Sequence, residues 1–178
     1  MGVKSCDYFE YDLLATSREI FIAGEVNNEF YIKLLKNLSY LRTLNNEPIT
    51  IYMNSDGGDL CTGVGIYDFI KSLPMQIKIV VLGEACSAAG FILQAADKRY
   101  ISKHSIIMLH EWSTSIDNNG TNVRNHVKIN DAIIDKIVDA ICTRCKLTKN
   151  SLSKNMKNDW FLTSDEAIAV GLADYIYE

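Results

Sequence analysis

The stretch IKIVVLGEACSAAGFILQAAD, residues 77–97, contains the junction on which the predicted fold depends. Residues 77–83, IKIVVLG, form an apolar run that predicts a buried strand. Residues 86–97, CSAAGFILQAAD, predict a helix, so Ser87 lies where the strand gives way to the helix. A serine at such a junction either caps the helix or is a nucleophile held at a sharp turn. The segment GEACSAAG alone does not decide between these roles.

Strands and helices alternate on both sides of this junction. The predicted strands are residues 19–26, 48–54, 77–83, 99–101 and 105–110. The predicted helices are a segment with Phe30, Leu34, Leu38 and Leu41 on one face, residues 60–73 ending before Pro74, residues 86–97, and a long amphipathic helix over 123–145. Near the end of the chain, Thr163-x-x-Glu166 predicts a capping box, and Gly171 is placed to end that short helix. The alternation predicts an α/β fold with a mainly parallel sheet covered by helices.

Three conspicuous segments follow predicted strands: SDGG (55–58), GEACS (83–87) and MLHEW (108–112). In parallel sheets the functional groups collect at the carboxyl ends of the strands. A serine nucleophile needs a base, and the chain has only three histidines. His104 lies in a polar turn and His126 in the charged start of the long helix, where a surface histidine is the default. His110 ends a strand and is the candidate base, although a lone histidine there is more often structural.

An oxyanion site requires backbone N–H groups close to the serine. Gly58, in the glycine pair of SDGG, would let its amide approach a ligand, and the amide of Ala88 would lie in the first turn of the helix after Ser87. Taken alone, SDGG is better explained as a glycine turn between a strand and a helix. The residues by themselves therefore support a Ser–His pair with an oxyanion site, and leave the structural alternatives open.

Composition restricts the classes of partner. The 178 residues carry a net charge of −4 and no cluster of Lys or Arg, which argues against nucleic acid or an anionic membrane as the main partner. We find no signal peptide and no apolar segment of membrane-spanning length, and five cysteines without framework spacing favour a reducing, cytoplasmic location. Cys142 and Cys145 form a CTRC pair, but a zinc site would need two further ligands. We therefore expect neither a metal nor a cofactor.

Five segments in order resemble the ClpP family, the proteolytic subunit of the Clp protease. They are SREIFIAGEVN (17–27), IYMNSDGGDLCTGVGIYDFIK (51–71), GEACSAAGFILQAADKRY (83–100), SIIMLHEW (105–112) and NDWFLTSDEAIAVGLAD (158–174). The second is similar to the family's N-S-P-G-G segment, the third to its nucleophile segment and the fourth to the segment that carries its base. The likeness covers nearly the whole chain.

The resemblance implies a site and an activity. It makes Ser87 the nucleophile, His110 the base and Asp159 the acid of a catalytic triad, with the amides of Gly58 and Ala88 as the oxyanion hole. The implied protein is a serine endopeptidase that cleaves unfolded polypeptides or peptides inside an oligomeric chamber. Without the resemblance, Asp159 would be a solvated acid in a loop.

The resemblance also implies a fold and partners. The fold is that of ClpP and the crotonases, with repeated ββα-type units in a single domain over 1–178 and a handle region at about 111–146 that contains the long helix. Handles of the family interlock, so that two stacked heptameric rings enclose the chamber, and a Clp ATPase is the candidate partner. The segment 1–17 is shorter than the family's usual N-terminus, which puts docking of that ATPase in question.

Two positions near the site depart from the family. Asp56 replaces the proline of N-S-P-G-G, and Glu111 replaces the glutamine that usually follows the base. Asp56 and Glu84 place two carboxylates near the site in sequence, where they either tune its chemistry or lie outside it. Two other functions remain as alternatives: a non-catalytic ring subunit that assembles with an active paralogue, and an acyl-CoA enzyme of the crotonase fold.

Overall fold

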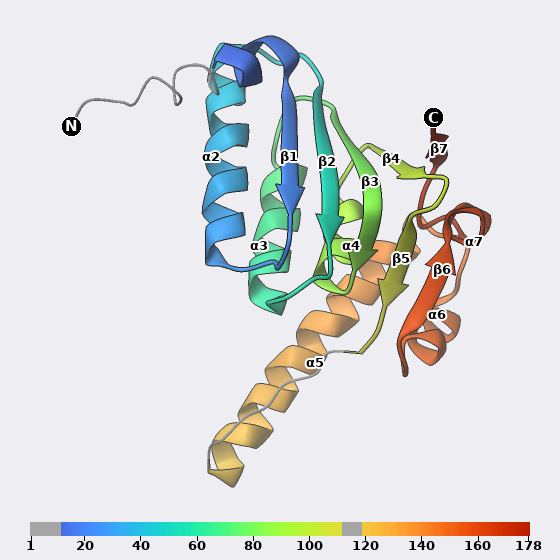
Figure 1. The fold of residues 1–178 in the computed structure, drawn as a ribbon. Coiled ribbons are helices and arrows are strands. Elements are labelled where there is room, and N and C mark those ends of the chain that lie inside the picture. Colours follow the sequence, from blue (N-terminus) through green and yellow to red (C-terminus); the bar gives the residue numbers. More distant parts are fainter. Residues whose placement is uncertain (1–11, 112–118) are drawn as a thin grey trace.

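The computed structural model describes residues 12–111 and 119–178, which contain a seven-stranded sheet covered by helices (Figure 1). The strands are β1 (Glu19–Ala23), β2 (Ile49–Ser55), β3 (Ile77–Cys86), β4 (Lys98–Ser102), β5 (Ile106–Leu109), β6 (Trp160–Thr163) and β7 (Tyr175–Tyr177). The helices are α2 (Asn28–Leu44), α3 (Leu60–Lys71), α4 (Ala88–Leu93), α5 (Gly120–Cys142), α6 (Lys149–Asn155) and α7 (Ser164–Val170). A further helical segment over 12–17 precedes β1. Most of the predicted N-terminal segment, residues 1–11, lies outside the described residues.

The sheet is mainly parallel, as the alternation of elements predicted. Its main path runs β1-β2-β3-β4-β7, and every neighbouring pair on that path is parallel. Strand β5 pairs parallel with β3 and antiparallel with β6. The carboxyl ends of β2, β3 and β5 therefore lie at the same edge of the sheet, where the three conspicuous segments were expected.

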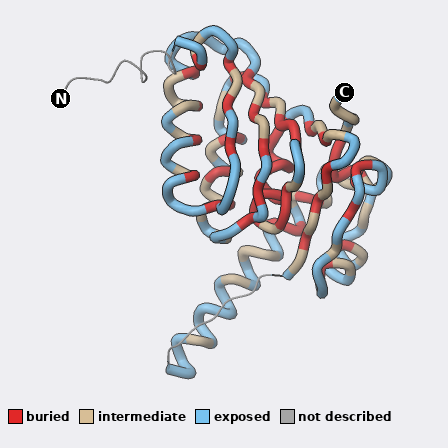
Figure 2. Tube along the Cα trace, viewed as in Figure 1, coloured by how far each residue is buried: buried red, intermediate tan, exposed pale blue. Residues whose placement is uncertain are grey.

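Helix α2 packs its apolar side onto the sheet, and the four residues predicted for that side are all buried. Strand β1 alternates in the same way: Ile20 and Ile22 are buried, whereas Phe21 between them is 63% exposed. Figure 2 shows the buried residues concentrated along the strands and on the sides of the helices that face them. The face of the sheet that carries Phe21 also carries Tyr52, whose ring stacks on Phe21 at 4.9 Å.

Strand β3 changes its partner along its length, and this change positions the site. It pairs with β4 as far as Val81 and with β5 from Glu84 onward. Gly83 lies at the change with a φ of +105°, where a Cβ would stand 2.5 Å from Asn54 Oδ1. The N–H of Gly83 donates to Ser105 Oγ at 2.7 Å. This irregularity brings the end of β3 beside β5.

The predicted helix over residues 86–97 is wrong at both ends. Strand β3 continues to Cys86, which pairs with Met108 of β5, and α4 ends at Leu93. Beyond α4, the guanidinium of Arg144 donates to the carbonyl oxygens of Gln94 and Ala96. Both carbonyls lie in the turn that leads from α4 to β4, so a residue about fifty positions away in sequence helps to hold the chain where the helix has ended.

Other boundaries differ in smaller ways. Strand β1 ends at Ala23 rather than at residue 26, because Gly24 turns the chain with a φ of +86°, and Val26 forms only an isolated bridge with Gly58. The sequence did not predict α6, β6 or β7. The capping box of Thr163 and Glu166 is confirmed, and Gly171 ends α7 in the left-handed conformation.

Helix α5 divides into a packed half and a projecting half (Figure 1). Its last turns bury Ile137, Val138 and Ile141 against the body. Its first turns extend away from the body, and Ile129 there is 55% exposed. Residues 112–118 of the expected handle region lie outside the described residues.

Candidate active site

Ser87 occupies a strained turn between β3 and α4. Its φ of 53° and ψ of −119° fall in a region that costs a non-glycine residue about 1–3 kcal/mol. The turn is held by its backbone: the N–H of Ser87 donates to Met108 O at 2.7 Å, and its carbonyl accepts from Phe91 N at 3.2 Å. Although Ser87 is the N-cap residue of α4, its side chain makes no capping hydrogen bond. The hydroxyl is therefore directed to another partner.

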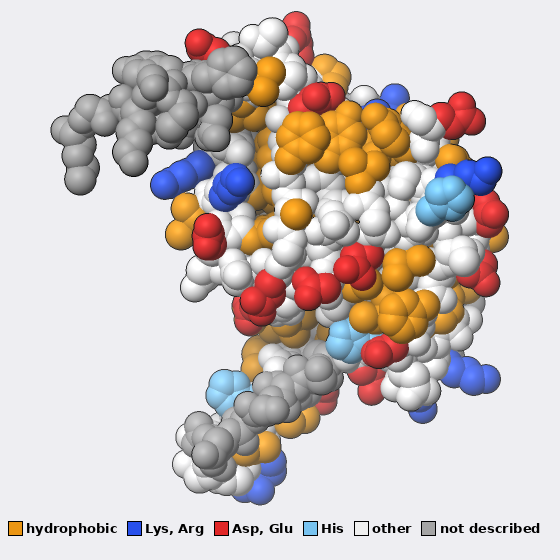
Figure 3. All heavy atoms as spheres, in the orientation of Figure 1, with side chains coloured by type: hydrophobic (Ala, Val, Ile, Leu, Met, Phe, Trp, Pro, Cys, Tyr) orange, Lys and Arg blue, Asp and Glu red, His pale blue; other side chains and the backbone are white. Residues whose placement is uncertain are grey.

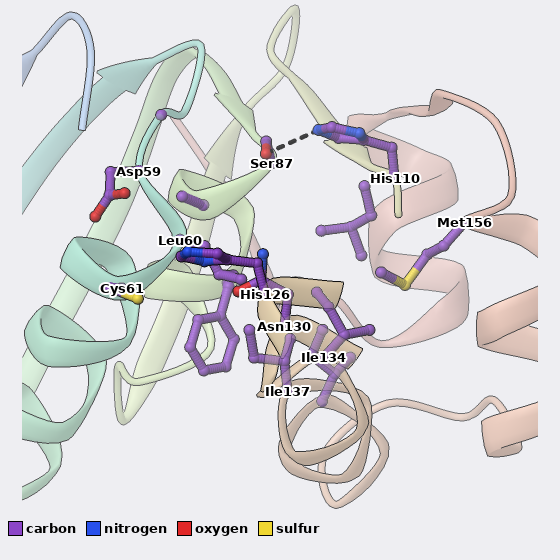
Figure 4. A pocket seen from close by; sticks show the side chains of 15 residues that line it. Asp59, Leu60, Cys61, Ser87, His110, His126, Asn130, Ile134, Ile137 and Met156 are labelled. Atoms are coloured by element: carbon purple, nitrogen blue, oxygen red, sulfur yellow. Dashed lines mark hydrogen bonds between the residues drawn. The ribbon is translucent and has the colours of Figure 1, made fainter. Parts of the chain in front are cut away.

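That partner is His110, one residue beyond the end of β5. A hydrogen bond joins His110 Nε2 and Ser87 Oγ at 2.8 Å (Figure 4). The side chain of His110 is 22% exposed, so it stands between the interior and the solvent. The parallel pairing of β3 with β5 brings the two residues together. Cys86 lies opposite Met108, and Ser87 follows Cys86 by one residue while His110 follows Met108 by two.

Asp159 lies on the other side of the His110 ring. The antiparallel pairing of β5 and β6 ends with Leu109 opposite Trp160, so His110 and Asp159 follow as the next facing pair. His110 Nδ1 and Asp159 Oδ1 are 4.0 Å apart, which is longer than a hydrogen bond, and the Asp159 side chain is 63% exposed. The structure thus brings Asp159 near His110 without a direct bond.

The glycine pair after β2 packs directly against the Ser87 turn. A Cβ on Gly57 would stand 2.6 Å from Cys86 O and 2.7 Å from Ser87 Cβ, so only glycine permits this approach. Gly58 lines the same cavity as Ser87, Ala88 and His110. In the bridge between Val26 and Gly58, the N–H of Val26 donates to Gly57 O and the N–H of Asp59 donates to Val26 O. The N–H of Gly58 takes no part in this bridge.

Ala88 lines the same cavity as Gly58 and Ser87. It is the first residue of α4, so its N–H has no acceptor within the helix. Donors of this kind stabilise an oxyanion when they are fixed in advance.

The carboxylates near the site act on Cys86, the neighbour of Ser87. The thiol of Cys86 donates to Glu84 Oε2 at 3.3 Å. Burial raises the pKa of Cys86 to about 12, and the hydrogen bond and charge of Glu84 and the charge of Asp56 add to that effect. Cys86 therefore stays a protonated thiol at neutral pH and does not compete with Ser87 as a nucleophile.

The cavity beside Ser87 contains residues that the sequence did not assign to the site. His126 and Asn130 of α5 line it together with Ser87 and His110 (Figure 4). We expected His126 to be a surface residue; it is exposed, and it also faces this cavity. Its spacing of four residues from Asn130 and eight from Ile134, on one helical side, is the signal that could have identified it.

Within residues 12–111 and 119–178, no three His, Cys, Asp or Glu side chains are grouped so as to hold a metal ion. No helix in the same ranges is long and apolar enough to cross a membrane. Cys142 and Cys145 are free thiols, and burial raises the pKa of Cys142.

The fold and the site define a class: an α/β protein with a serine and a histidine in contact at the carboxyl edge of a mainly parallel sheet. The family model described as Clp protease matches residues 4–178. The chain therefore belongs to the Clp protease family.

Curated relatives agree with this assignment. The chain is 29% identical over 171 residues to the ATP-dependent Clp protease proteolytic subunit of Borreliella afzelii (strain PKo), covering 93% of this chain and 86% of that protein. It is equally similar, at 29% over 171 residues, to the protein of the same name from Borrelia garinii subsp. bavariensis, with 93% and 87% covered. The ATP-dependent Clp protease proteolytic subunit 1 of Borreliella burgdorferi is also 29% identical over 171 residues, with 93% and 87% covered.

Proposed function

We propose that the protein is a serine endopeptidase that hydrolyses unfolded polypeptides or peptides inside an oligomeric chamber. The observation that carries the proposal is the 2.8 Å contact between Ser87 Oγ and His110 Nε2 on a turn that the backbone holds in a strained conformation. A serine hydroxyl becomes a nucleophile when a base stands within hydrogen-bond distance to take its proton. The family membership of the chain supports the same activity.

The steps follow from the positions of these groups. With the His110 proton on Nδ1, the Ser87 hydroxyl donates to Nε2, and Oγ attacks the scissile carbonyl as that proton moves to His110. The N–H groups of Gly58 and Ala88 receive the oxyanion. His110 then gives its proton to the leaving amine. Water, deprotonated by His110, hydrolyses the acyl-enzyme and frees Ser87.

Asp159 has the role of orienting His110 and stabilising its protonated form. For a direct bond, the 4.0 Å separation between Nδ1 and Oδ1 must shorten by about 1 Å. Catalytic hydrogen bonds are often long without substrate and tighten in the complex. The exposed position of Asp159 leaves it room for such a movement.

Assembly is part of the proposal. The projecting half of α5 carries exposed apolar side chains, among them Val127 and Ile129, which are 38% and 55% exposed. We assign this helix to contacts between protomers of stacked heptameric rings in the cytoplasm. The relatives are named as subunits of an ATP-dependent protease, and a Clp ATPase is the partner we assign by that likeness.

The decisive test is labelling of the assembled protein with a fluorophosphonate, together with peptide hydrolysis. We expect the label on Ser87, and a loss of about 10⁴-fold or more in kcat/KM for Ser87→Ala. Ser153→Ala changes an exposed serine of α6 and is the matched control, with wild-type hydrolysis. Unchanged hydrolysis in Ser87→Ala would refute the proposal. An assembled wild-type chain without label would instead indicate a non-catalytic subunit, and binding of acyl-CoA would indicate an enzyme of the crotonase type.

A further inference from the structure

The cavity at Ser87 extends well beyond the reacting groups. It has a volume of about 360 Å³ and reaches from Ser87 and His110 along α5 (Figure 4). Cavities of this order hold small ligands or large side chains. In the acyl-enzyme, the side chain on the acyl side of the cleaved bond begins next to the carbonyl carbon that Ser87 Oγ holds. That side chain therefore enters this cavity.

Much of the cavity is apolar. Its apolar lining comes from α3, α4, α5, β5 and the residue after α6: Leu60, Phe91, Leu109, Ile134, Ile137, Ile141 and Met156. Among the described residues, no Lys, Arg or Glu lies in the lining. Burial of a large apolar group here is favourable at about 25 cal/mol per Å². The apolar part of the lining favours a substrate side chain with an apolar stem, but it does not distinguish one apolar side chain from another.

A polar wall distinguishes the cavity from a purely apolar one. His126 and Asn130 are four residues apart on α5 and so lie on one side of that helix. Figure 4 shows both side chains reaching from α5 into the cavity below Ser87. Within the part of the chain that the structure describes, no hydrogen bond or ion pair occupies either side chain. Both are therefore available to a ligand.

Asp59 and Cys61, at the start of α3, also line the cavity. Asp59 Oδ1 accepts from the N–H of Thr62 at 2.7 Å and from Thr62 Oγ1 at 2.6 Å, which caps α3. On the α5 wall, the groups that can meet a substrate tip are an amide and an imidazole. Each offers both a donor and an acceptor to a neutral polar group.

We propose that this pocket, given the serine peptidase function above, selects an acyl-side residue with an apolar stem and a neutral hydrogen-bonding tip, such as tyrosine or glutamine. Asn130 and His126 bind the tip, while the apolar lining buries the stem. Because His126 is exposed and Asn130 is partly exposed, water replaces the tip when it is missing. The discrimination is therefore modest, at about three- to tenfold in kcat/KM, as for a single net hydrogen bond.

The test uses the assembled full chain and pairs of peptidyl aminomethylcoumarin amides that differ only in the residue before the fluorophore. The pairs are Tyr against Phe and Gln against Met. We expect Tyr to exceed Phe and Gln to exceed Met by about three- to tenfold in kcat/KM. In His126→Leu/Asn130→Leu both ratios should fall to about one. Asn125→Leu introduces the same side chain on α5 at a position outside the cavity lining, and should leave the ratios as in the wild type.

The outcomes separate this inference from the function on which it rests. The wild-type chain could hydrolyse the peptides in a reaction that depends on Ser87, but with Tyr/Phe and Gln/Met ratios at or below one. That result would refute the inference and leave the peptidase function standing. Ratios that persist in the double variant would also refute it, because another part of the site would then set the preference. Absence of both hydrolysis and fluorophosphonate labelling would refute the function and the inference together. If the double variant does not assemble, the wild-type ratios alone decide.

Discussion

The Ser87 turn and the Asp159 segment lie on opposite sides of His110 and are built very differently. The turn is held by backbone hydrogen bonds to β5 and α4 and packed against Gly57, and its hydroxyl is 2.8 Å from the imidazole. Asp159 precedes a short strand, is 63% exposed and stays 4.0 Å from the same ring. The core of the protomer thus positions the proposed nucleophile and base, whereas the proposed acid lies at the surface. Substitutions should therefore have effects that decrease from the serine side to the acid side.

Figure 3 shows one face of the molecular surface, on which a row of acidic side chains lies between two hydrophobic areas. The carboxylates that matter for the site have separate tasks: Glu84 accepts from the Cys86 thiol, Asp59 caps α3, and Asp159 stands near His110. Position relative to the core, rather than charge alone, distinguishes their roles.

The largest effect on the serine side short of removing Ser87 is expected from Gly57→Ala. The new Cβ would meet Cys86 O at 2.6 Å and Ser87 Cβ at 2.7 Å, at a φ of +96° that alanine rarely adopts. Displacement of the Ser87 turn by about 1 Å would lower kcat/KM by roughly 100-fold or more. Peptide hydrolysis and urea unfolding of the variant measure both consequences, and we expect a loss of stability of about 1–3 kcal/mol.

Gly120→Ala is the matched control, because a Cβ there meets nothing closer than Arg124 Nη1 at 3.6 Å. Full activity in Gly57→Ala would show that the close approach of the glycine pair does not hold Ser87 in place.

A smaller loss is expected from Asp159→Asn. The amide keeps the shape but not the charge, so it stabilises protonated His110 less. Loss of the aspartate from a tightly bonded triad costs about 10⁴-fold in kcat. Because Asp159 is exposed and its Oδ1 is 4.0 Å from His110 Nδ1, we expect kcat at neutral pH to fall by only about 10- to 100-fold.

Asp68→Asn, on the exposed side of α3, serves as the control for the charge change. A loss of the order of 10⁴-fold in Asp159→Asn would contradict the contrast drawn above, because the acid would then be coupled to His110 as closely as the serine is.

The same contrast explains what the sequence could predict. Ser87 and His110 were proposed from residue type and from their places near the ends of apolar runs that predict strands, although the exact strand ends were wrong by up to three residues. Asp159 was identified only by its resemblance to a family motif, because its approach to His110 depends on the pairing of β5 with β6 across some fifty residues. Spacing in the sequence carries no signal for such a pairing.

The prediction of helix ends and of pocket residues from the sequence was limited for a similar reason. Arg144, which follows α5, donates to the carbonyl oxygens of Gln94 and Ala96 in the turn after α4, and the local sequence carries no signal for this contact. His126 and Asn130 were not predicted as site residues because a helical stripe is recognised by its apolar residues, whereas these two are polar. In both cases the missing information is a tertiary contact or a side that mixes polar and apolar groups.

Asp174 contrasts with Asp159, because it is a carboxylate in direct contact with a buried arginine. Asp174 Oδ1 lies 2.5 Å from Arg99 Nη2, and its Oδ2 accepts from the N–H and the Nε of Arg99 at 2.9 and 3.1 Å. Arg99 is only 2% exposed. Asp174→Asn would leave this buried guanidinium unpaired, at a cost of about 3–5 kcal/mol in the free energy of unfolding. We expect peptide hydrolysis by the folded variant to stay within about twofold of wild type, because Asp174 does not line the Ser87 cavity.

The pH dependence gives this last prediction its sign. Burial opposes ionisation of Asp174, but the hydrogen bonds and charge of Arg99 outweigh it and lower the pKa of the carboxyl in the folded chain. A lowered pKa stabilises the fold above the unfolded value of about 3.9, and this contribution is lost as the pH falls below it. In urea unfolding, the free energies of unfolding of wild type and Asp174→Asn should therefore differ most at pH 7. The difference should shrink as the pH falls below about 4. A gap that stays constant with pH, or a loss of hydrolysis as large as that in Asp159→Asn, would mean that the two aspartates do not divide stability and chemistry between them.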